Sequence, residues 1–126
     1  MAKQVVRTTR APKAIGPYSQ AVSSKGLIFC SGQIALDPAS GELQGGSVAD
    51  ETRLCMQNLN AVLDAAGATW ADVLKVNAYL TDISQFAAFN EVYGEFFDED
   101  PPARAAVGVA ALPKGAQVEV ECIARV

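Results

Sequence analysis

A strict alternation of apolar and polar residues from Leu74 to Thr81 limits the fold more than any other feature of the sequence. A period of two residues is that of a half-buried β-strand, because successive side chains point to opposite faces of a sheet. The apolar side chains predicted to share one face are Leu74, Val76, Ala78 and Leu80. A strand of this kind needs a second layer to cover its apolar face.

Two segments with a helical period flank this strand and can supply that layer. Before it, Ser47 followed by Asp50 predicts a helix N-cap, and Gly67 is a suitable stop. The apolar stripe between them consists of Cys55, Leu59, Val62, Leu63 and Ala66. After the strand, Ser84 is the expected cap of a second helix. Its aromatic stripe, which we interpret as core, consists of Phe86, Phe89, Tyr93 and Phe97.

The remaining apolar runs predict five further strands. Three precede the first helix, at Val5–Val6, 18–22 and 27–30, and two follow the second helix, within 105–112 and 117–122. Because the chain has 126 residues, we expect one domain that spans residues 1–126. The fold class predicted is α+β, with a single mixed sheet of about six strands and two helices on one face.

Two of the predicted strands are apolar on both faces, which two helices on one face of a sheet cannot explain. These are the runs from Leu27 to Cys30 and from Ala105 to Val109. A sheet that is apolar on both sides and covered on one needs a partner for its other side. The sequence therefore predicts a homo-oligomer that packs sheet against sheet.

Composition excludes several classes of function. A net charge of −4 argues against a general affinity for nucleic acid, and the apolar runs are too short to span a membrane. There is no histidine, so catalytic triads and His-ligated metals are excluded, and we expect no metal site. The three cysteines are far apart, which suits free thiols in a reducing, cytoplasmic setting.

The first part of the chain has an uneven charge distribution. The cations Lys3, Arg7, Arg10 and Lys13 come with no acidic residue before Asp37. Such a segment is faintly like a transit peptide. We favour a short first strand at Val5–Val6, because a Pro and Gly turn region follows it.

The candidate site lies in the segment from Pro101 to Val126. Arg104 enters a run of small and apolar residues without another charge, and valines flank Glu119 in a second strand-like run. An arginine and a carboxylate on neighbouring strands can hold a small acid and a water at fixed positions. We therefore interpret Arg104 as a carboxylate clamp and Glu119 as the group that orients water.

Structural alternatives stay open for both residues. Spacing alone favours an ion pair between Arg104 and either Glu119 or Glu121, since such pairs are common. Alternation places the two glutamates on one strand face and does not say which of them is functional.

Four other residues are candidates, each with a structural alternative: Tyr18, Ser31, Gly32 and Asn90. Tyr18 could wall a pocket or be a strand-edge aromatic, and Ser31 with Gly32 could offer a hydroxyl and an amide or simply end a strand. Asn90 stands in an aromatic helix segment, so we expect it to make a hydrogen bond of open purpose.

At these positions the sequence resembles the reactive-intermediate deaminase family, also called Rid or YjgF, and its archetypal RidA branch most closely. The resemblance covers essentially the whole chain. The segments that carry it are Ile15–Gln20, Ser31–Gln33, Asn58–Leu59, Ala65–Gly67, Pro102–Arg104, Leu112–Gly115 and Val118–Glu121.

The resemblance implies a chorismate-mutase-like fold and a homotrimer with sites in the clefts between subunits. It implies a cofactor-free hydrolase, a 2-iminobutanoate/2-iminopropanoate deaminase, that converts 2-imino acids and their enamine tautomers, such as 2-aminoacrylate, to 2-oxo acids and ammonia. Carried over by position, Arg104 binds the substrate carboxylate, Glu119 positions the water and Tyr18 belongs to the catalytic group. The residues implied to bind substrate are Ser31, Gly32, Asn90 and Ala106.

One position departs from some relatives, which have a cysteine where this chain has Ala106. Cysteine modification at that position therefore cannot regulate this chain, and imine hydrolysis needs no thiol. Two functions of other classes remain as alternatives. One is an endoribonuclease-type translation inhibitor, which the acidic chain without histidine disfavours, and the other is a non-catalytic metabolite-binding or chaperone trimer.

Overall fold

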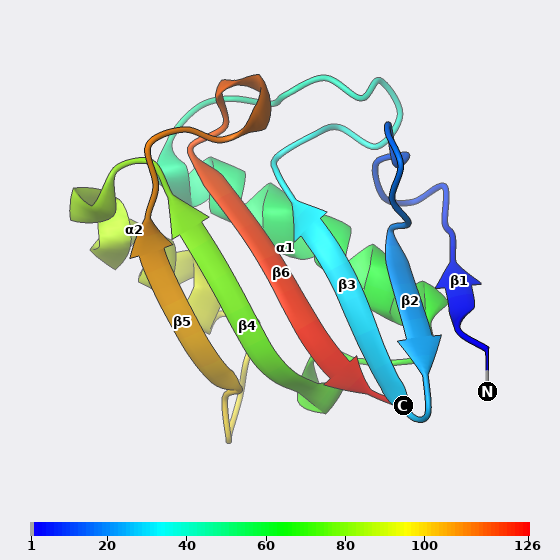
Figure 1. The fold of residues 1–126 in the computed structure, drawn as a ribbon. Coiled ribbons are helices and arrows are strands. Elements are labelled where there is room, and N and C mark those ends of the chain that lie inside the picture. Colours follow the sequence, from blue (N-terminus) through cyan, green and yellow to red (C-terminus); the bar gives the residue numbers. More distant parts are fainter. Residues whose placement is uncertain (1) are drawn as a thin grey trace.

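The computed structural model describes residues 2–126, and its strands form one sheet (Figure 1). The strands are β1 (Gln4–Val6), β2 (Ala21–Ser24), β3 (Leu27–Gln33), β4 (Val73–Leu80), β5 (Ala103–Gly108) and β6 (Val118–Arg125). Their order across the sheet is β1-β2-β3-β6-β4-β5, and neighbours are antiparallel except β4 and β5, which are parallel. The α+β class with a mixed sheet of six strands is confirmed, as is the short first strand.

Two helices, α1 (Val48–Ala65) and α2 (Phe86–Gly94), cover one face of this sheet (Figure 1). α1 begins as predicted, since the Ser47 hydroxyl accepts a hydrogen bond from the Asp50 amide at 3.0 Å. It ends before Gly67, whose φ of 86° suits glycine at a helix C-terminus. The core lies between this layer and the sheet, and many of its side chains are fully buried.

Two local predictions were wrong. Leu74 is exposed, because the register between β4 and β6 shifts between Val73 and Lys75 and turns Val73 inward in its place. Ser84 does not cap α2. It lies in a 3₁₀ turn (Ile83–Gln85) that precedes the helix, and the carboxylate of Asp82 accepts a hydrogen bond from the Ser84 amide at 3.0 Å.

The face of the sheet away from the helices carries exposed apolar side chains. On β3, Ile28 and Cys30 are buried under the helix layer, whereas Leu27 and Phe29 are exposed. Further large apolar side chains exposed on the strands are Val5, Leu74 and Val107. The strands are thus apolar on both faces while helices cover only one, and a sheet-to-sheet partner stays a prediction.

The part of the chain that the structure describes contains neither a helix that could span a membrane nor a cluster of side chains that could hold a metal ion. No helix within residues 2–126 is both long and apolar enough to cross a membrane. The same residues contain no group of three or more His, Cys, Asp or Glu side chains that could hold a metal ion. Cys30, Cys55 and Cys122 are free thiols and all three are buried.

Candidate functional site

Arg104 points into the helix layer. It lies on β5 opposite Val76 of β4, which is fully buried beneath the helices, so the two side chains share that face. Its Nη1 donates a hydrogen bond to Asn90 Oδ1 on α2 at 2.7 Å. Within residues 2–126 Arg104 forms no ion pair. The alternative of a structural pair with Glu119 or Glu121 is therefore wrong for this chain.

Three aromatic rings of α2 surround the Arg104 guanidinium. Its Cζ lies 5.2 Å from the ring centroid of Phe86, 5.9 Å from that of Phe89 and 4.9 Å from that of Tyr93. Helical spacing places these rings and Asn90 on one face of α2, and each cation–π contact contributes about 0.5–2 kcal/mol depending on its burial. The guanidinium is therefore held in place by neutral groups only.

The aromatic stripe of α2 thus has two roles, packing in the core and contact with Arg104, and the sequence predicted only the first. Phe89 and Tyr93 are core residues, as predicted. Their contact with Arg104 was missed, and the signal for it was the polar Asn90 within the stripe. Burial also raises the pKa of Tyr93 to about 12.

Glu119 and Glu121 lie on the opposite face of the sheet. Val118 and Val120, which alternate with them on β6, are fully buried under the helices. Glu121 is committed to a structural contact, because its Oε1 accepts a hydrogen bond from the Tyr79 hydroxyl at 2.6 Å. That hydrogen bond, followed by burial, raises the pKa of Tyr79 to about 12. Glu119 accepts no hydrogen bond from any residue within 2–126.

Glu119 lines a cavity of about 240 Å³, which we call the Glu119 cavity. Tyr18 and Gly32 line it as well, together with the cationic side chains of Lys13 and Lys114. Burial is the main cause that raises the pKa of Glu119, and the negative charge of Glu121 adds to it. A carboxylate in this position has the environment of a general base.

The Glu119 carboxylate lies so close to Gly32 that it occupies the space a side chain would need there. A Cβ atom built on Gly32 would overlap that group, with the carboxyl carbon at only 2.9 Å. The backbone of β3 also has an irregular register with β6 between Cys30 and Gln33, which brings Gly32 against Glu119. A glycine at this point therefore leaves room for the carboxylate.

The last two candidates are Ser31 and Ala106. Ser31 donates a hydrogen bond from Oγ to the carbonyl oxygen of Ser19 at 2.6 Å, and it lines a separate cavity of about 340 Å³ together with Tyr18. Ala106 follows Arg104 by two residues on β5 and packs against the core on the helix side.

The candidates therefore form two groups on opposite faces of the sheet. Arg104, Asn90 and Ala106 lie on the helix side, whereas Tyr18 and Glu119 lie at the Glu119 cavity with Gly32. The prediction that Arg104 and Glu119 occupy neighbouring strands was wrong, because β4 lies between β5 and β6. Arg104 lines a different cavity, of about 470 Å³, beside Tyr93. One chain thus presents two separate groups of candidate residues.

Comparison with known proteins identifies relatives of this chain. Residues 8–126 match the family model described as endoribonuclease L-PSP. A RutC family protein of Pyrococcus horikoshii is 49% identical over 122 residues, which cover 97% of each chain. The human 2-iminobutanoate/2-iminopropanoate deaminase is 47% identical, over 97% of this chain and 89% of its own length. A protein of unknown function from Yersinia pestis, assigned to the conserved Rid family, superposes with a TM-score of 0.97 at 43% identity, over 99% of this chain and all of its own.

The contact between Gly32 and Glu119 predicts the effect of Gly32→Ala. The new methyl group should displace the end of the flexible Glu119 side chain, because the overlap is with that side chain and not with the backbone. We expect a folded protein whose melting temperature falls by a few degrees at most. A crystal structure of the variant should show the carboxylate moved out of the Glu119 cavity, and an unmoved carboxylate would contradict the prediction. Gly45→Ala, where nothing lies within 4 Å of the added atom, is the matched control.

Proposed function

The chain belongs to the endoribonuclease L-PSP family, also called Rid or YjgF, and on that premise we propose that it is a 2-iminobutanoate/2-iminopropanoate deaminase. Its substrates are 2-imino acids and their enamine tautomers, and its products are 2-oxo acids and ammonia. The observation that carries the proposal is the half-buried Arg104, which neutral groups hold in place and which has no carboxylate partner within residues 2–126.

Arg104 is the clamp for the substrate carboxylate. A guanidinium has five N–H donors in a planar fork, and the known partner of Arg104, Asn90 Oδ1, takes one of them. The remaining donors can form two parallel hydrogen bonds to one carboxylate, which fixes both the position and the plane of a small acid. Ala106 borders the same place and leaves space for the substrate.

Glu119 positions and deprotonates the attacking water. The water oxygen adds to C2 of the imino acid while its proton passes to the Glu119 carboxylate. The Glu119 carboxyl group returns that proton to the nitrogen and so forms a carbinolamine. The hydroxyl of the carbinolamine gives its own proton to the same nitrogen as the C–N bond breaks, so that ammonia leaves and C2 becomes the carbonyl carbon of the 2-oxo acid. An imine is already electrophilic, so orientation of the two reactants supplies most of what is needed. Tyr18 and Gly32 line the cavity around that water, and Ser31, which precedes Gly32 on β3, lines the separate cavity beside Tyr18.

The complete site requires two copies of the chain. Arg104 and Glu119 lie on opposite faces of one sheet, so the Arg104 of one protomer must meet the Glu119 of another. A homotrimer packed sheet against sheet allows this, since cyclic symmetry repeats the same contact at every interface. The exposed apolar side chains Leu27, Phe29 and Val107 support such an interface.

The description of the family model also names ribonuclease activity. The net charge of −4 and the absence of histidine leave this chain poorly suited to bind and cleave RNA, so we give the deaminase priority.

Arg104→Ala and Arg104→Lys test the clamp. We expect both to reduce kcat/KM by about tenfold or more for 2-iminopropanoate generated by an amino-acid oxidase, because lysine keeps the charge and loses the fork. Release of the 2-oxo acid is the measured quantity. Arg53→Lys, at a surface arginine that pairs with Glu95, is the control and should retain full activity. Undiminished turnover in both Arg104 variants would defeat the assignment.

The raised pKa of Glu119 predicts how activity depends on pH. A general base acts in its ionised form, so kcat/KM should fall as the pH drops through the raised pKa, above the value of about 4.3 for an ordinary glutamate. Glu121→Gln removes the neighbouring charge that contributes to the shift and keeps an acceptor for Tyr79. The acidic limb of the pH profile should then move to lower pH, and a limb that does not move would mean that another group titrates.

A further inference from the structure

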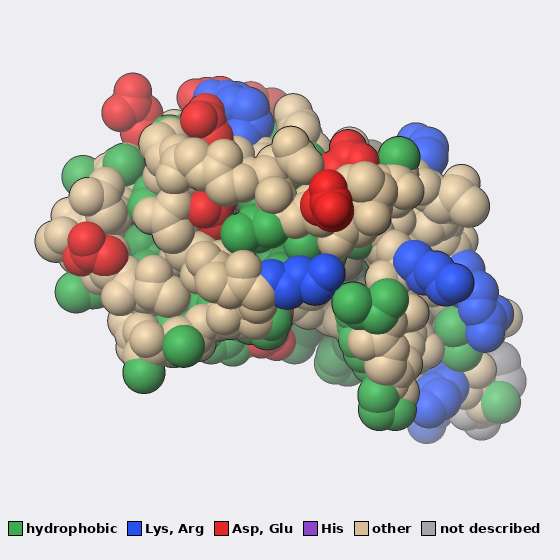
Figure 2. All heavy atoms as spheres, turned by 90° about the horizontal axis from the view of Figure 1, so that it is seen from above, with side chains coloured by type: hydrophobic (Ala, Val, Ile, Leu, Met, Phe, Trp, Pro, Cys, Tyr) green, Lys and Arg blue, Asp and Glu red, His purple; other side chains and the backbone are tan. Residues whose placement is uncertain are grey.

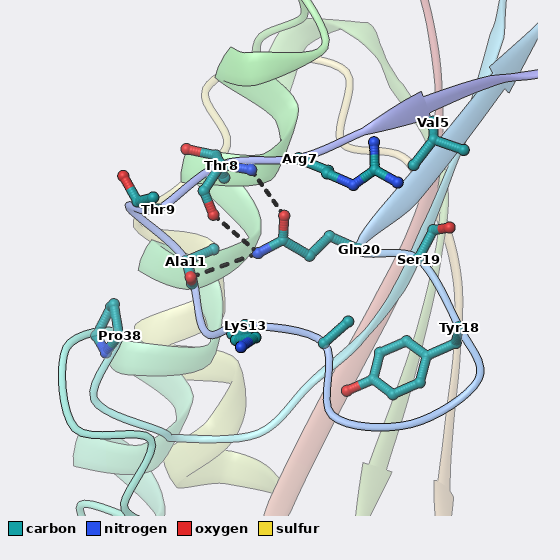
Figure 3. A pocket seen from close by; sticks show the side chains of 11 residues that line it. Val5, Arg7, Thr8, Thr9, Ala11, Lys13, Tyr18, Ser19, Gln20 and Pro38 are labelled. Atoms are coloured by element: carbon teal, nitrogen blue, oxygen red, sulfur yellow. Dashed lines mark hydrogen bonds between the residues drawn. The ribbon is translucent and has the colours of Figure 1, made fainter.

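A fourth cavity, of about 740 Å³, lies between the segment that follows β1 and the start of β2 (Figure 3). We call it the Arg7 cavity. Besides Arg7, its polar lining includes Lys13, Tyr18 and Ser19. Its volume falls within the range of small-molecule sites in proteins. No step proposed for the deaminase uses it.

The charge around the Arg7 cavity is positive on an otherwise acidic chain. Five of the ten Lys and Arg residues precede Asp37, the first acidic residue. Figure 2 shows several of the chain's Lys and Arg side chains gathered over the end of the sheet that carries β1. Arg10 in this segment is neutralised by Asp64, whereas Arg7 and Lys13 form no ion pair or side-chain hydrogen bond within residues 2–126. Two cations without partners beside one cavity favour an anion.

A buried amide fixes the wall that carries these cations. Gln20 is only 5% exposed and lies in the middle of the lining residues in Figure 3. Its Oε1 accepts from the Thr8 amide at 2.8 Å, and its Nε2 donates to the carbonyl oxygens of Thr8 at 3.0 Å and Pro12 at 2.8 Å. Arg7 and Lys13 stand at the two ends of the segment held in this way. Their backbone positions are therefore set before any ligand arrives.

The Arg7 cavity adjoins the Glu119 cavity. Tyr18 and Lys13 line both of them, so these two side chains form the boundary between the cavities. A substrate whose C2 lies at Glu119 can thus extend its side chain past Tyr18 toward Arg7. The end of that side chain would meet two cations, to which an acidic group is complementary and an apolar group is not.

We propose that the Arg7 cavity receives an acidic side chain, and that the substrates therefore include 2-imino acids with a second, terminal carboxylate, such as 2-iminoglutarate. Arg7 donates charge-assisted hydrogen bonds to the second carboxylate, and Lys13 adds a positive charge at the boundary. The chemical step at C2 is the same hydrolysis. The inference rests on the proposed deaminase function and adds a substrate class to it.

The test compares two acids of equal chain length on the full-length protein. The imines of glutamate and norvaline are generated by an amino-acid oxidase, and kcat/KM is measured for wild type, Arg7→Gln and Arg10→Gln. We expect Arg7→Gln to lower kcat/KM for 2-iminoglutarate about tenfold, mainly through KM, and to leave 2-iminopentanoate within about twofold. Arg10→Gln removes a cation of the same segment that does not line the cavity, and it should change neither value.

Binding of the product acids separates this inference from the proposed function. Titration calorimetry with 2-oxoglutarate and 2-oxopentanoate needs no turnover, so it remains informative if no imine is hydrolysed. We expect 2-oxoglutarate to bind wild type more tightly than 2-oxopentanoate, and Arg7→Gln to abolish that preference. Equal binding of the two acids by wild type, or a preference that survives Arg7→Gln, would overturn the inference even if 2-iminopentanoate is turned over normally.

Discussion

The two faces of one β-sheet cannot serve the same small ligand, and this constraint governs the arrangement of the candidate residues. Arg104 faces α2 and Glu119 faces away from the helices, with β4 between their strands. Neither side chain can turn to the other face, because a one-residue shift in register would reverse every buried residue of its strand. The chemistry proposed for this chain therefore depends on how copies meet, and not on a cleft within one copy.

The two groups of candidate residues are built by different means. Neutral partners hold Arg104, since Asn90 takes one donor and three rings cover the guanidinium, so its charge remains available to a ligand. Glu119 instead owes its raised pKa to burial and to a like charge, and Gly32 provides the space it occupies. An exposed apolar face next to a carboxylate of this kind fits an interface, where association removes both from water.

The sequence was sufficient for features that depend on local periodicity. Alternation identified the inward face of β4 from Val76 to Leu80 and the shared face of Glu119 and Glu121, and Ser47 and Gly67 marked the ends of α1. It was not sufficient where distant segments meet. The position of β4 between β5 and β6 depends on long-range pairing, which local patterns do not contain. The sequence also could not show which of the two glutamates has a hydrogen-bond partner. Tyr79 donates its hydrogen bond to Glu121 only because β4 and β6 pair in this register.

Complementation between two inactive variants tests most directly whether Arg104 and Glu119 act from different protomers. Arg104→Ala and Glu119→Gln protomers would be unfolded, mixed in equal amounts and refolded together, with mass tags to confirm mixed oligomers. In a cyclic trimer with random assembly about three-quarters of the particles are mixed, and each has one intact site of three, so we predict about a quarter of wild-type activity per protomer. Mixed oligomers as inactive as either variant alone would show that both residues act within one chain, or that they do not share a site.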